Sequence, residues 1–245
     1  MSKLPNAPLI EVIFELRWNV SDKQELGKCQ YLHGDLFALI KSDFNYREAL
    51  IAPEVPMELY QNVPAHRFRF AQNEYPLVQV GPGLLTLNTT DSKYIWNDFK
   101  SQIDNVISKF LEVYQFDEKQ KISLILQYFD FFEFDFESAN VHEFLKNKLK
   151  ISVEQEFYAN ISKPNNLNLS FHYKTEFGQL TITIFRGQNN AKDGIVMQTN
   201  ITSDPIQPDL NVISIWLNNS QKFCSQLFKD MTKGTLYESF NVAKK

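Results

Sequence analysis

Four carboxylates in the middle of the chain have the spacing most suggestive of chemistry. They are Asp130, Glu133, Asp135 and Glu137. The last three share one face of a predicted strand, about 7 Å apart, and such a ladder is one way to bind a divalent cation for phosphodiester hydrolysis. No lysine follows any of them by two residues, as many metal nucleases require, and all three alternate with Phe. We therefore expect a solvated strand face, with a metal-dependent nuclease as the less favoured alternative.

Asp130 differs from the other three because it falls in the apolar phase of the strand, between Tyr128 and Phe132. A carboxylate that faces a core needs a partner or a local irregularity such as a β-bulge. We expect a structural hydrogen-bonding role for Asp130, and Arg17 on the first predicted strand is a candidate partner.

Arg67 and Arg69 alternate with Phe68 and Phe70. Basic and aromatic side chains on a strand can bind and stack nucleic-acid bases. In this stretch the two kinds of residue point to opposite faces, so an apolar core side and a solvent side explain the pattern more simply. Both arginines are kept as candidate binding residues.

Other reactive patterns point to structure rather than to catalysis. The glycines of the segment 81–83 lack the spacing and the lysine of a nucleotide loop, and they predict a hairpin turn. The four histidines are scattered, without the spacing of metal ligands. Cys29 and Cys224 lie on the apolar stripes of predicted helices, which favours buried free thiols. We predict no catalytic residue, metal or cofactor.

The elements that position these residues follow from hydrophobic periodicity. Residues 121–137 alternate over their whole length and predict one long central strand, and residues 10–19 predict another. Residues 45–64 contain three prolines and predict a long loop. The remaining predictions are helices at about 21–44, 92–114, 139–149 and 211–231, and strands at 66–70, 77–80, 84–88, 167–173, 180–184 and 195–201.

The predicted order is strand, helix, three strands and long helix, and it occurs twice. We infer an internal duplication with an N-terminal half at 1–118 and a C-terminal half at 119–245, joined near the charged segment 115–121. Antiparallel sheets packed on helices define an α+β fold. Whether the halves share one sheet is left open by the sequence.

Composition restricts the class of protein. The chain has 245 residues, 43% of them hydrophobic, and a net charge of −4, which argues mildly against a general binder of nucleic-acid backbones. No apolar run is long enough for a signal peptide or a membrane span. We expect a cytoplasmic protein that does not enter a membrane.

Several segments carry a resemblance to a known family. They are the opening APLIEVIFELRW of residues 7–18, the turn VQVGPG of 78–83, Tyr94 and Trp96, QYFD of 127–130, and Phe228 with Met231 and Thr232. Together they resemble a sporadically distributed, uncharacterised family of bacterial proteins of about this length. Gln127 and Asp130 depart from it, since the family favours Arg-Tyr-Ile-Asn there. The resemblance implies a bacterial cytoplasmic protein from a mobile or phage-defence locus, and it transfers no activity.

We therefore predict a non-enzymatic subunit, sensor or antitoxin-like protein that binds a protein partner or a second copy of itself. The motivation is the absence of catalytic patterns beside many aromatic residues, because exposed aromatic surface marks partner sites. Nucleic-acid binding on the sheet surface, through Arg67, Arg69 and nearby lysines, is the alternative.

Overall fold

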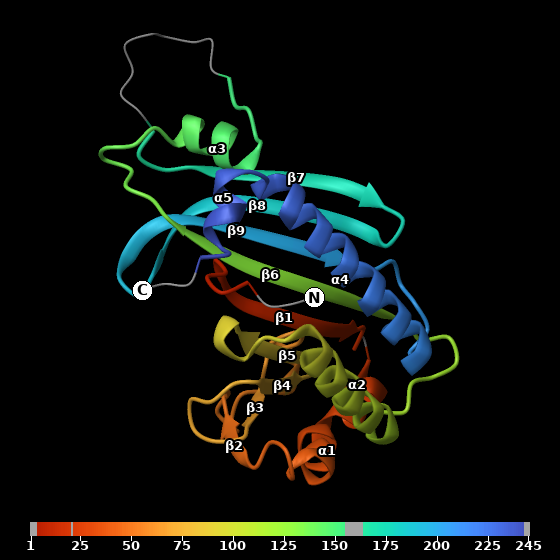
Figure 1. Ribbon diagram of the computed structural model, residues 1–245. Helices are drawn as coiled ribbons and strands as arrows, with labels where there is room; N and C mark the ends of the chain where they lie inside the picture. Colours follow the sequence, from red (N-terminus) through yellow and green to blue (C-terminus); the bar gives the residue numbers. More distant parts are fainter. Residues whose placement is uncertain (1–3, 21, 155–163, 243–245) are drawn as a thin grey trace.

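The computed structural model describes residues 4–20, 22–154 and 164–242, and it shows an α+β fold (Figure 1). One antiparallel sheet has nine strands in the order β2-β3-β4-β5-β1-β6-β9-β8-β7. The strands are β1 (Leu9–Trp18), β2 (Tyr46–Ala49), β3 (His66–Arg69), β4 (Leu77–Gly81), β5 (Leu84–Thr90), β6 (Ile122–Glu133), β7 (Asn168–Thr175), β8 (Gly178–Asn189) and β9 (Lys192–Thr202). The helices are α1 (Lys23–Ile40), α2 (Trp96–Val113), α3 (Val141–Leu149), α4 (Leu210–Thr232) and α5 (Thr235–Ser239), with 3-10 turns at Met57–Leu59 and Asp91–Lys93.

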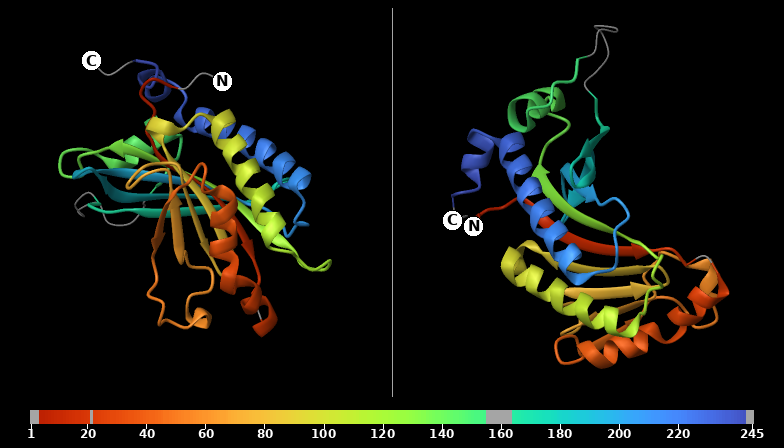
Figure 2. Two further views of the ribbon diagram at one scale, coloured as in Figure 1. Left: turned by 90° about the horizontal axis from the view of Figure 1, so that it is seen from below. Right: turned by 90° about the vertical axis from the view of Figure 1, so that its right-hand side faces the viewer.

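The helices gather on one side of the curved sheet, as the two views of Figure 2 show. Within the described residues no helix covers the opposite side, which we call the open face. None of the described helices is long and apolar enough to cross a membrane.

The two predicted halves share one continuous sheet. Strands β1 and β6 lie side by side at its centre and are antiparallel. Outward from β1 the order is β5, β4, β3 and β2, and outward from β6 it is β9, β8 and β7. The sequence had left this question open. The internal duplication and the boundary between the halves stay predictions.

The alternate apolar residues of the central strands are buried on the side that the sequence predicted. Val12, Phe14 and Leu16 of β1 and Leu124 and Leu126 of β6 are buried against the helices. Because successive side chains of a strand point to opposite faces, the residues between them lie on the open face. The helices contribute apolar stripes to the same core, with Phe99, Ile103, Val106, Ile107 and Phe110 buried on α2.

A second, smaller core lies under α3, α5 and the end of α4. Phe132 and Phe134 pack there with Leu145 and Phe240. Rings of Phe134 and Phe144 meet edge-on with centroids 5.2 Å apart. The C-terminal half therefore has its own apolar cluster as well as a share in the main one.

Several predicted boundaries are wrong. Strand β8, for example, ends at Asn189, five residues beyond the predicted end at 184. The segment 45–64 is not a pure loop, because Tyr46–Ala49 forms the edge strand β2, paired with β3. The long central strand does not reach residue 137. It ends at Glu133, and the chain then turns, with Asp135 accepting hydrogen bonds from the backbone NH and side chain of Ser138.

The turn predicted at the glycines of 81–83 is confirmed. Gly81 of β4 pairs with Leu84 of β5, so the hairpin loop is Pro82-Gly83. Gly83 has φ of +81°, a left-handed conformation that glycine adopts without steric cost. Proline followed by such a glycine is the sequence of a type II turn.

Candidate functional site

Arg17 is not the partner of Asp130, so that prediction was wrong. Antiparallel pairing of β1 with β6 places Arg17 opposite Ser123 and Leu9 opposite Asp130. The two positions lie about 24 Å apart along β6, at roughly 3.4 Å per residue. Arg17 instead donates from Nε to Glu15 Oε2 at 2.7 Å, within its own strand.

Asp130 sits beside a β-bulge, which is one of the two expected solutions for a buried carboxyl group. The register between β1 and β6 shifts between Leu9 and Glu11, next to the position where Leu9 faces Asp130. Asp130 is 4% exposed, and burial, with a smaller contribution from Asp91, raises the pKa of its carboxyl group to about 7. Since burial disfavours the charged form, the group is largely neutral below that pH.

Arg67 and Arg69 stabilise the N-terminal edge of the sheet. Arg67 forms an ion pair with Glu48 of β2 at 3.3 Å. Arg69 is buried, donates from Nη1 to the carbonyl oxygen of Glu74 at 2.8 Å, and lies over the ring of Tyr75. Both guanidinium groups therefore bind groups of this chain.

Glu133 and Asp135 do not form the predicted carboxylate ladder. Glu133 Oε2 is 2.7 Å from Lys192 Nζ of β9. Asp135 accepts from the hydroxyl of Ser138 at 2.6 Å and the backbone NH of Glu137 at 2.9 Å, and these bonds lower the pKa of Asp135. Among the residues that the structure describes, no three His, Cys, Asp or Glu side chains are arranged to hold a metal ion.

The remaining titratable side chains of interest are buried. His33 of α1 stacks on His66 of β3 with ring centroids 3.8 Å apart, and burial lowers the pKa of His66 to about 4. Cys29 and Cys224 are free, buried thiols, as predicted, and burial raises their pKa values to about 11 and about 12. Thiols protonated at neutral pH are poor nucleophiles.

Polar side chains on the open face bind one another across the strands. Gln127 of β6 donates to Glu15 of β1 at 2.7 Å and accepts from Gln198 of β9 at 2.9 Å. Asn88 of β5 donates to Glu11 of β1 at 3.0 Å. These bonds link the central four strands by side chains as well as by backbone.

Three cations on this face are paired with carboxylates. They are Arg17, Arg67 and Lys192, whose pairs are given above. A nucleic-acid backbone would have to compete with these carboxylates, because phosphate binding depends on cations that release counter-ions from the polymer. The face offers weak support for nucleic-acid binding.

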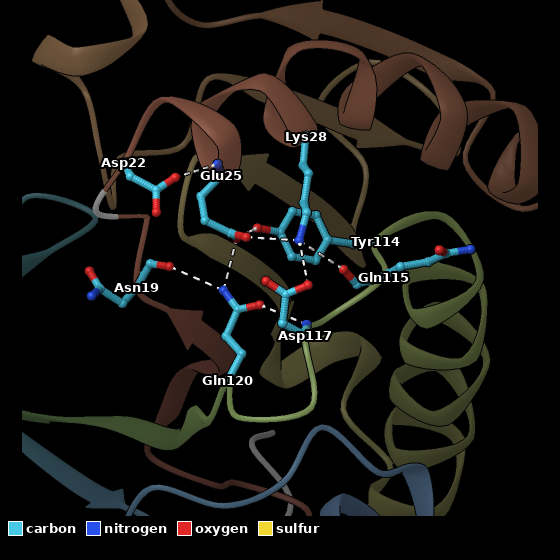
Figure 3. A network of polar contacts seen from close by, with 8 residues as sticks. All are labelled: Asn19, Asp22, Glu25, Lys28, Tyr114, Gln115, Asp117 and Gln120. Carbon is cyan, nitrogen blue, oxygen red and sulfur yellow. Dashed lines mark hydrogen bonds and ion pairs between the residues drawn. The ribbon is translucent and has the colours of Figure 1, made fainter.

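The segment 115–121, which we call the connector, is fixed to α1 by a network of polar contacts (Figure 3). Glu25 of α1 accepts from the hydroxyl of Tyr114 at 2.5 Å, from Gln120 at 2.9 Å and from Lys28 at 2.8 Å. Lys28 also reaches Asp117 at 3.3 Å. Burial acts to raise the pKa of Glu25, but these hydrogen bonds together lower it. The network is structural, because its donors and acceptors satisfy each other.

An open apolar groove of about 870 Å³ lies on the helix side of the C-terminal half. It is bounded by the outer strands β7 and β8, by α4 and by the end of α3. Its walls are mainly apolar side chains, and the ones used below are Phe171, Tyr173, Leu180, Ile182, Phe223 and Leu227. Tyr173 is 50% exposed. Such a groove suits an apolar ligand or a partner's side chains and has no arrangement for bond-breaking chemistry.

Sequence reasoning missed the groove, although it found the strands that form it. Alternation of Leu169, Phe171 and Tyr173 correctly predicted an apolar side for β7. The informative signal was the short helix at 139–149, which is too short to cover that side.

Comparison with known proteins identifies no relative of this chain. No family model, curated protein or solved structure matches this chain.

Proposed function

We propose that this chain is a non-enzymatic protein-binding subunit of a bacterial cytoplasmic system, and that a partner binds in the groove. The observation that carries the proposal is the apolar surface of the groove, where Tyr173 is exposed and Phe171 and Leu227 are half-buried. Apolar surface that stays open to water is costly, and in proteins it marks interaction sites. A place in a phage-defence locus stays a prediction from the family resemblance, and an antitoxin-like role stays a prediction from the sequence.

The polar residues support the same proposal indirectly. Arg17, Arg67, Arg69, Glu133 and Asp135 all bind groups of this chain. Side chains that act on a substrate need donors or acceptors directed at that substrate. The alternative of nucleic-acid binding on the open face has less support, because three of the cations there are paired with carboxylates of this chain.

The test is affinity purification from the native host with nuclease treatment and quantitative mass spectrometry. Tyr173→Asp adds a charge to the groove, whereas His172→Asp adds a charge to the same strand on the open face. We expect one protein to copurify with the wild type and with His172→Asp, and to fall at least tenfold with Tyr173→Asp.

Other outcomes of this purification decide against the proposal. Equal recovery from all three proteins would remove the groove as the binding site. A second copy of this chain as the only stable partner would make the protein a homo-oligomer. Recovery of nucleic acid that nuclease removes, together with any proteins, would favour the open-face alternative.

A further inference from the structure

The groove has a counterpart in the N-terminal half that is filled by a helix. Counted outward from the central pair, β4 and β3 hold the same places as β8 and β7. In the register, Phe68 of β3 faces Val78 of β4, and Phe171 of β7 faces Ile182 of β8. The corresponding positions in the two halves therefore carry similar apolar side chains.

In the N-terminal half, α1 covers these positions. The ring of Phe37 on α1 lies 5.4 Å from the ring of Phe68, and His33 stacks on His66. Phe68 is fully buried as a result. The helix has 18 residues, and it buries an apolar stripe that includes Leu32, Leu36 and Ile40.

In the C-terminal half, the helix at the same place in the chain is too short. Helix α3 has 9 residues and ends at Lys150, which has the left-handed φ of 60° that commonly ends helices. Helix α3 packs on Phe132 and Phe134, and only its end, at Leu149, borders the groove. In the part of the chain that the structure describes, no helix covers Phe171 and Tyr173.

From this difference we infer that the groove binds an amphipathic α-helix of the partner protein, lying over β7 and β8 as α1 lies over β3 and β4. The inference rests on the proposed function and specifies the partner's binding element. Leu180 and Ile182 belong to the second strand from the sheet edge, so the occupant lies on the face of the sheet. A helix with its side chains is about 10 Å across, and α1 shows that such a helix fits over the equivalent strands of the N-terminal half.

The chemistry of the groove defines the partner helix. It presents apolar side chains at positions i, i+3, i+4 and i+7, the pattern by which helices bind grooves. Its opposite side is polar, because it faces water. Lys150, Lys174, Glu176 and Asp230 border the groove with charges of both signs.

The test uses two displayed peptide libraries of equal length panned on the full chain. One library is helical, with apolar residues varied at i, i+3, i+4 and i+7, and the other is extended, with alternating apolar residues and a central proline. We expect helical binders whose affinity falls at least tenfold with Tyr173→Asp and with Phe171→Ala, and stays unchanged with His172→Asp. Bound peptide should show the circular dichroism of a helix.

Three results overturn the inference. The first is enrichment of extended peptides alone, and the second is enrichment of helices whose binding ignores Tyr173→Asp. The third is no enrichment from either library. In each case the purification from the host still decides the proposed function separately, because it asks whether any partner depends on Tyr173. Thermal unfolding of each variant shows that the panned protein is folded.

Discussion

The hydroxyl of Tyr114, at the end of α2, donates a 2.5 Å hydrogen bond to the carboxylate of Glu25 in α1. The two residues are 89 positions apart in the sequence. Their contact joins the two helices of the N-terminal half at the point where the chain crosses to the C-terminal half. Gln120 binds the same carboxylate, and Lys28 joins it to Asp117, so the connector is held at two of its residues.

We expect Glu25→Ala to lower the free energy of unfolding by about 2 kcal/mol, because it leaves the buried hydroxyl of Tyr114 and two partly buried donors without an acceptor. Since the pKa of Glu25 is lowered in the folded state, this contribution is present above the ordinary pKa of a glutamate and is lost as the pH falls below it. Urea unfolding at pH 7 measures the change. Glu118→Ala, in the exposed part of the connector, is the control and should change stability by less than about 0.5 kcal/mol. Equal effects of the two substitutions would contradict the network's role.

Because the two halves differ in what covers the sheet, replacing an equivalent phenylalanine by alanine should lower the free energy of unfolding by different amounts in each half. Phe68→Ala removes a fully buried ring under α1 and should cost about 3–5 kcal/mol. Phe171→Ala removes a ring that borders the groove and should cost much less, about 1 kcal/mol, because water already reaches the site. Chemical unfolding of both variants measures the difference. A loss at Phe171 as large as that at Phe68 would mean that the groove is covered in the free protein.

Periodicity in the sequence predicted the strands and helices that have one buried face. Strand β1, strand β6 and helix α2 each combine a regular apolar stripe with polar residues. Such a pattern indicates an element with one buried face. The bulge beside Asp130 was also within reach, because a carboxyl group in an apolar phase demands an irregularity or a partner.

Features that depend on the pairing of distant segments were out of reach. Strand β2 is short and mostly exposed, so it has no stripe, and only its pairing with β3 makes it a strand. Arg17 was assigned to Asp130 because strand register is not encoded in either strand alone. The groove depends on where α3 ends relative to β7, which no local pattern contains.

Replacing two of the glycines by alanine should change the stability of the protein in opposite directions. A Cβ atom at Gly81 would lie 2.0 Å from the carbonyl oxygen of Val63, so Gly81→Ala should destabilise the hairpin strongly, by several times RT. A Cβ atom at Gly27, inside α1, would meet nothing within 4 Å. Gly27→Ala should therefore stabilise the protein by up to about 1 kcal/mol through helix propensity. Thermal unfolding of the two variants measures both signs, and a destabilising Gly27→Ala would show that α1 is not a continuous helix there.

The buried carboxyl group of Asp130 predicts a pH dependence of stability that one substitution removes. Its pKa is about 7 in the folded protein against an ordinary 3.8, so between these values the folded state holds a proton that the unfolded state has lost. Stability therefore falls as the pH rises from about 4 to about 7, by on the order of 4 kcal/mol, and the loss persists above pH 7. Asp130→Asn should match the wild type near pH 4 and be more stable at pH 8, as measured by urea unfolding across this range. Glu118→Gln, in the exposed connector, should keep a constant difference from the wild type. A constant difference for Asp130→Asn as well would mean that Asp130 stays ionised in the fold.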